Sequence, residues 1–119
     1  MKEYVAIVKL ENSLSVCFYL EQDKVMAIGE KMNELNDEAY MNGYNWEAFF
    51  NYYLSKHHPE ILESMESDPE AGMYAAYFEL TSENEKKAQT FSQIIVELIE
   101  NENKIFEIVK SEGGQIEWN

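Results

Sequence analysis

The residues in this sequence that could bind a metal ion or attack a substrate are few. His57 and His58 are neighbours, and on a helix their side chains would point about 100° apart, so they cannot hold one metal ion together. Zinc needs three or four converging ligands, commonly His or Cys, and the chain contains no third histidine and no second cysteine. We therefore expect no metal site, and we interpret the pair as a helix end whose last carbonyl groups attract the imidazoles.

Cys17 is the single cysteine, and it lies in a run of alternating apolar residues. No cation lies close to it in the sequence to activate it, so a buried, reduced thiol is the simplest interpretation and a reactive nucleophile is the alternative. The chain has no calcium-loop spacing, nucleophile elbow, phosphate-binding loop or dinucleotide fingerprint. We expect no catalysis and no cofactor. A small acid–base enzyme stays an open alternative that would need two carboxylates in a deep pocket.

Net charge is the most informative quantity in the sequence. There are 23 acids and nine bases, all of them lysine, and the formal charge is −14. Residues 1–58 carry −4 and residues 59–119 carry −10. Such a chain repels phosphate and lacks the arginine fork that binds phosphate and guanine, so nucleic-acid binding is excluded. Acidic surfaces steer basic protein partners instead, and the simpler alternative is that the charge only keeps the protein soluble.

The candidate partner-binding residues form an acidic stretch with one nearby tyrosine. Glutamates three residues apart share one helix face, so the stretch would present its carboxylates from one side of a short helix and the turn after it. The tyrosine lies about 100° from the apolar stripe of its helix and is expected to be exposed, as tyrosines at interfaces are. The alternative is an ordinary solvated helix face. The candidates are Tyr52, Glu60, Glu63, Glu66, Asp68 and Glu70.

The core is predicted to centre on a helix over residues 46–57. Its large apolar side chains recur at positions i, i+3, i+4, i+7 and i+8, which gives one continuous stripe. Asn45 is the expected N-cap, after a turn at residues 42–43. Pro59 ends the helix, because the residue before a proline is pushed out of helical geometry. Pro59 can then begin a second short helix, whose inward residues would be Ile61, Leu62 and Met65.

The remaining segments predict strands and helices on both sides of that helix. Residues 4–10 and 14–20 alternate and form a hairpin, and residues 73–80 form a third strand, apolar on both faces and therefore central or covered. Residues 115–119 could add an edge strand. Three further helices are expected: one that starts at residues 22–23, one that starts at Ser82, and a short one around residues 105–109. Ser82 and Glu85 would form a capping box at the start of the second of these. Turns are expected at residues 11–13, 68–72 and 113–114.

A chain of 119 residues fits a single domain, residues 1–119, that can bury a core without disulfides. The element order predicts an α+β fold. In it, the hairpin, the third strand and the C-terminal edge strand make a small antiparallel sheet, with four or five helices packed mainly on one face. No stretch approaches the ~18 apolar residues of a membrane span, and no secretory leader is recognisable, so we expect a cytoplasmic protein.

Two segments carry a resemblance to a known family. Residues 42–48 read NGYNWEA, and residues 68–73 read DPEAGM. In these segments, and over roughly residues 43–106, the chain resembles the Immunity protein 51 family of bacterial polymorphic-toxin systems. We interpret the motif residues as ones that build the fold rather than contact a partner. They are Gly43, Tyr44, Trp46, Asp68 and Gly72.

The resemblance implies a small cytoplasmic α+β protein, without catalysis or cofactor, that binds and neutralises a cognate toxin. The charge agrees with this implication, because many antibacterial toxins are nucleases with basic surfaces, and an acidic inhibitor can place carboxylates where phosphates would lie. The alternative is a non-catalytic adaptor or regulatory domain that binds a basic partner or itself. An exposed edge of the third strand or an aromatic patch would allow such a homodimer.

Overall fold

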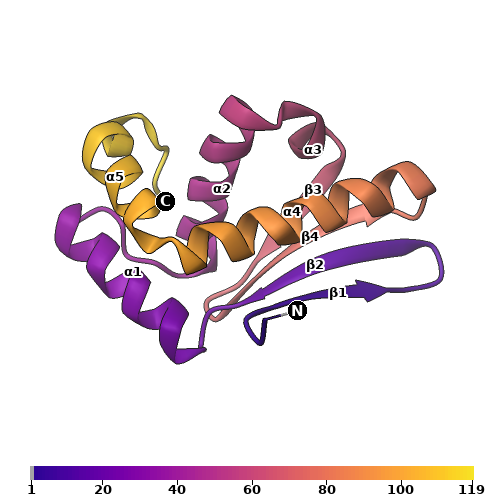
Figure 1. Ribbon diagram of the computed structural model, residues 1–119, viewed down its shortest axis with the longest axis horizontal. Coiled ribbons are helices and arrows are strands. Elements are labelled where there is room, and N and C mark those ends of the chain that lie inside the picture. Colours follow the sequence, from indigo (N-terminus) through magenta and orange to yellow (C-terminus); the bar gives the residue numbers. More distant parts are fainter. Residues whose placement is uncertain (1) are drawn as a thin grey trace.

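The computed structural model describes residues 2–119, in which helices cover one face of a four-stranded antiparallel sheet (Figure 1). The strands β1 (Val5–Lys9), β2 (Ser13–Tyr19), β3 (Met65–Pro69) and β4 (Met73–Glu79) lie in the spatial order β1-β2-β4-β3. The helices are α1 (Asp23–Leu35), α2 (Gly43–His57), α3 (Pro59–Glu63), α4 (Ser82–Glu100) and α5 (Glu102–Glu112), followed by the 3-10 turn η1 (Gly113–Gln115). The predicted α+β fold is confirmed.

Helix α2 is the centre of the core, as its apolar stripe predicts. Trp46, Phe49, Phe50 and Leu54 are each at most 1% exposed. The Phe50 ring lies 5.5 Å from the ring of Phe18 on β2, so the helix packs directly on the sheet. Edge-to-face aromatic pairs of this kind each add about 0.5–1.5 kcal/mol beyond the apolar area they bury.

The two faces of the sheet differ sharply. On β2 and β4, the side chains that face the helices are apolar and almost completely buried, and all but Ala76 are large: Leu14, Val16, Phe18, Tyr74 and Phe78. The opposite, open face carries small residues between tyrosines. Cys17 and Ala75 pair across it and are buried, yet neither belongs to the contiguous core. The predicted buried thiol is confirmed, as is the central position of β4 between β2 and β3.

The fourth strand is not the one that the sequence suggests. Residues 115–119 form η1 and an irregular tail, and the sheet is completed instead by β3, which was expected to be the end of a helix and a turn. Met65 therefore lies on a strand, and the turn shrinks to residues 70–72. An edge strand tolerates this polar sequence, because one face is solvated and Pro69 falls at its last position.

Two helix caps also differ from prediction. The side chain of Asn42, not Asn45, caps α2 by accepting the Asn45 N–H at 3.0 Å, so the helix begins at Gly43. Thr81 rather than Ser82 caps α4, by accepting the Asn84 N–H at 3.0 Å. The two helices therefore begin three residues and one residue earlier than expected. The prediction misplaced the caps because the neighbouring Asn and Thr or Ser residues cap helices about equally well.

The other predicted helices are confirmed. α1 buries Val25, Ile28 and Met32, and α4 buries Phe91 and Ile95 among others. The chain breaks at Asn101 before α5, and α1 and α5 pack against each other beside the sheet (Figure 1). This arrangement leaves one long side of α2 without a covering helix.

Candidate functional site

The segments 42–48 and 68–73 meet in space at the start of α2. A Cβ atom on Gly43 would overlap the carbonyl oxygens of Glu70 and Met73, so the helix touches the β3–β4 turn backbone to backbone. Gly43 does not have a positive φ, and glycine is needed here for close approach alone. Gly72 in the turn faces the Glu21 carboxylate, which a Cβ atom would meet at 2.7 Å. The first turn of α2 is thereby fixed against the sheet.

Asn45 is buried and joins three separate segments. Its side-chain NH2 group donates to the carbonyl oxygens of Glu38, at 3.3 Å, and Tyr40, at 2.7 Å, in the loop before α2. Its side-chain oxygen accepts the Asn119 N–H at 2.7 Å. The tail after η1 is held further by the Trp118 indole, which donates to the Gly113 carbonyl at 3.1 Å. These bonds place the tail alongside α2.

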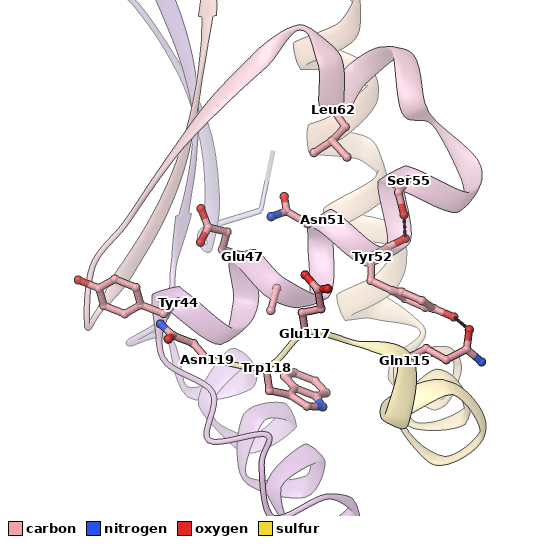
Figure 2. A pocket seen from close by; sticks show the side chains of 11 residues that line it. Tyr44, Glu47, Asn51, Tyr52, Ser55, Leu62, Gln115, Glu117, Trp118 and Asn119 are labelled. Atoms are coloured by element: carbon pink, nitrogen blue, oxygen red, sulfur yellow. Dashed lines mark hydrogen bonds between the residues drawn. The ribbon is translucent and has the colours of Figure 1, made fainter.

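Between α2, α3 and the tail lies an open cavity of about 600 Å3, which we call the α2 cleft (Figure 2). Figure 2 shows side chains from the outward side of α2 facing those of the tail. Glu47 is fixed on one wall, because its carboxylate accepts a hydrogen bond from Ser67 on β3. The lining residues are Tyr44, Glu47, Ala48, Asn51, Tyr52, Ser55, Leu62, Gln115, Glu117, Trp118 and Asn119.

Tyr52 lies at one end of the α2 cleft and is half-buried rather than fully exposed. Its hydroxyl donates to the Glu112 carboxylate and accepts from the Lys56 ammonium, which also pairs with Glu112. The hydrogen bonds from Lys56 and Tyr52 hold the pKa of Glu112 below its usual value, and the same bond to Glu112 raises the pKa of Tyr52. This end of the cleft is therefore internally neutralised.

The five candidate acids do not lie on one helix face. Glu60 and Glu63 are on α3, and Glu70 is in the β3–β4 turn. Glu66 and Asp68 are on β3, where they pair with Tyr77 and Ala75 on the open face of the sheet. All five are exposed, and we call them the acidic band. The band runs along the edge of the sheet because α3 leads directly into the edge strand.

The acidic band has little compensating charge. Within residues 2–119, the imidazole of His58, with Nδ1 3.5 Å from the Glu60 carboxylate, is the one basic side chain close enough to pair with a carboxylate of the band. Lysines pair elsewhere: Lys9 with Glu85 on α4 at 3.1 Å, and Lys24 with Glu100 at 3.2 Å. Lys9 points to the helix side, so no lysine occupies an open-face position on the four strands. The β3 edge is consequently a strongly negative part of the surface.

Neither histidine belongs to a metal-binding arrangement in the described chain. The His57 ring packs on Tyr53 with centroids 4.6 Å apart, and residues 2–119 contain no group of three or more His, Cys, Asp or Glu side chains that could hold a metal ion. Over the same range, no helix combines the length and apolar character needed to cross a membrane.

Sequence reasoning missed most residues of the α2 cleft. Tyr44, Glu47, Ala48 and Asn51 are the polar or small positions opposite the stripe of α2, so helical periodicity alone could have grouped them as one face. Nothing in the sequence indicates that the tail 115–119 returns to this face. That contact depends on Asn45, which binds a residue 74 positions away.

One comparison with known proteins gives a match. The family model described as Immunity protein 51 matches residues 5–113, which include the sheet, all five helices of the described chain and both segments at the start of α2. The matched region contains the α2 wall of the cleft and ends before the tail. No curated protein and no solved structure matches the chain.

Proposed function

Because the chain belongs to the Immunity protein 51 family, we propose that it binds one cognate bacterial toxin domain and neutralises it by covering the toxin's working surface. The observation that carries the proposal is the family match over residues 5–113, since immunity families imply a toxin partner. Inhibition of this kind is stoichiometric and needs no catalysis or cofactor in the inhibitor. The protein would act in the cytoplasm, where the toxin's target lies.

Electrostatics supports a basic partner. The chain carries a formal charge of −14, and the acidic band concentrates exposed carboxylates that lack lysine partners. A toxin that binds phosphate, such as a nuclease, presents cations where its substrate binds, and carboxylates of the band can take the place of the phosphates. Close charge pairs across protein interfaces couple by about 1.5–7 kcal/mol, and such fields raise the association rate at low salt.

The position of the acidic band suits docking. It lies on an edge strand and an adjoining short helix, both accessible, and it borders the open face of the sheet on one side. Tyr77 and Val8, 37% and 39% exposed, lie on that open face and can add apolar contact next to the charges. Self-association through this surface would place two acidic bands close together, so we favour a basic partner over a homodimer.

A survival assay tests the proposal. The C-terminal domain encoded by the gene next to this one is induced in a laboratory bacterium, and colonies are counted with and without the protein. We expect rescue by this chain and none by an unrelated protein of similar size and charge. Toxicity without rescue would refute neutralisation of that toxin. Equal rescue by the unrelated acidic protein would refute specific binding and leave only nonspecific charge.

A further inference from the structure

The α2 cleft has the composition of a site for a planar cation. Its lining residues include two carboxylates, three side-chain amides and three aromatic residues, of which Tyr44 turns its ring away from the tail, and no lysine lines it (Figure 2). Carboxylate and amide oxygens accept hydrogen bonds from a guanidinium group in a fork, and aromatic faces stack on it. The residues are Glu47 and Glu117, then Asn51, Gln115 and Asn119, then Tyr44, Tyr52 and Trp118.

We propose that the α2 cleft receives an arginine side chain of the toxin, and that this arginine is a hot spot of the complex. The identity of the partner rests on the proposed function, whereas the ligand chemistry rests on the cleft itself. Arginines seated in desolvated, aromatic-walled pockets are among the few residues that carry most of an interface's binding free energy.

The walls of the cleft are in place before any partner binds. Glu47 accepts through Oε2 from Ser67, and its Oε1 has no donor within residues 2–119. The tail wall is fixed separately by the Asn119 N–H bond to Asn45 and by the Trp118 indole. Figure 2 shows Glu117 reaching from this tail toward Asn51 on α2. A preformed site costs less ordering entropy on binding, which favours a tight complex.

Away from the Tyr52 end, where Lys56 pairs with Glu112 and lies over the Tyr52 ring, the protein does not neutralise this cleft with its own cations. Within residues 2–119, neither Glu47 nor Glu117 has an ion-pair partner, and the nearby Lys56 is engaged by Glu112 and Tyr52 at one end. A second copy of the chain would bring another net charge of −14 to the cleft. Charge complementarity therefore selects a basic partner.

The first experiment uses a probe that does not depend on finding the toxin. N-acetyl-arginine amide is titrated into the 15N-labelled protein, and N-acetyl-citrulline amide, of the same shape but uncharged, is the matched ligand. We expect saturable shifts of the Trp118 indole and of the Asn51 and Gln115 side-chain amides with arginine, and much smaller ones with citrulline. Equal responses to both ligands, or shifts confined to the acidic band, would overturn the proposal.

The second experiment removes the carboxylates without emptying the site. In Glu47→Gln/Glu117→Gln, the new amide oxygen at position 47 can still accept from Ser67, so the fold should be retained, which the dispersion of the amide spectrum checks. We expect arginine-amide binding to weaken about ten-fold, because two charge-assisted hydrogen bonds are lost. Glu30→Gln/Glu34→Gln on α1 removes the same charge at two exposed positions outside both the cleft and the acidic band, and it should change binding less than about two-fold.

The same variants, used with the toxin, separate the two proposals. If the wild-type chain fails to rescue, the proposed function fails and the arginine titration still decides the chemistry of the cleft. If the wild-type chain rescues and the cleft variant binds the toxin as tightly as the α1 control, the cleft is not the docking site and the inference fails alone.

Discussion

Replacing Gly43 with alanine isolates the contact between α2 and the β3–β4 turn. The added methyl group would overlap two backbone oxygens, those of Glu70 and Met73. Neither can rotate away as a side chain would, because the Glu70 N–H donates to the Met73 carbonyl at 2.7 Å and closes the turn. Either the helix or the turn must therefore shift.

The sign of the effect is diagnostic. Helix propensity alone predicts that alanine in place of glycine stabilises by up to about 1 kcal/mol. Overpacking costs about 1–3 kcal/mol, and its upper end applies when rigid backbone must move. We therefore expect a net destabilisation of about 2 kcal/mol. A chain of 119 residues has an unfolding entropy of about 0.25 kcal/mol/K, so Tm should fall by about 8 °C.

Urea denaturation followed by circular dichroism measures this change, with Gly114→Ala as the matched control. A Cβ atom on Gly114 meets nothing within 4 Å, so that substitution should leave the midpoint nearly unchanged. A Gly43→Ala variant as stable as the wild type, or more so, would refute the close approach of α2 to the turn.

Four further outcomes are expected. Asn45→Ala should cost about 2–4 kcal/mol, because two carbonyl groups and the Asn119 N–H lose their partner, and amide hydrogen exchange should accelerate in the tail. Tyr74→Phe should be neutral or stabilising by up to about 1 kcal/mol in urea melts, since the buried hydroxyl has no hydrogen-bond partner within residues 2–119; a large loss would mean that the hydroxyl is bonded. The hydrogen bond from Tyr4, reinforced by Lys24, lowers the pKa of Glu100 below its unfolded value. The ionised Glu100 carboxylate therefore stabilises the fold above about pH 4.3, and this stabilisation is lost as the pH falls through the folded pKa. In urea melts, the difference in stability between wild type and Glu100→Gln should shrink from pH 6 toward about pH 3. Replacing the four glutamates of the acidic band with glutamine should slow association with the toxin and flatten its salt dependence in stopped-flow measurements, and unchanged kinetics would exclude the band from the docking surface.

The elements of this fold whose faces repeat along the chain were predictable. The stripe of α2 and the alternation of β2 identify buried residues such as Trp46 and Phe18, because one side chain in every turn or every second position must face the core. The edge strand β3 was not predictable in this way. Its polar sequence has no strong period, and pairing with β4 is what makes Met65–Pro69 a strand.

Of the two candidate surfaces, the acidic band was predictable from the sequence and the α2 cleft was not. Charge, the absence of arginine and the exposed carboxylates of the acidic band could be read from the sequence, since they depend on composition and local polarity. The α2 cleft could not, because its two walls come from α2 and from a tail far away in sequence. The sequence by itself determined which surfaces are buried and which are charged. Only tertiary structure decided where residues 115–119 return and why position 43 is glycine, because both depend on backbone contacts between segments that no local pattern connects.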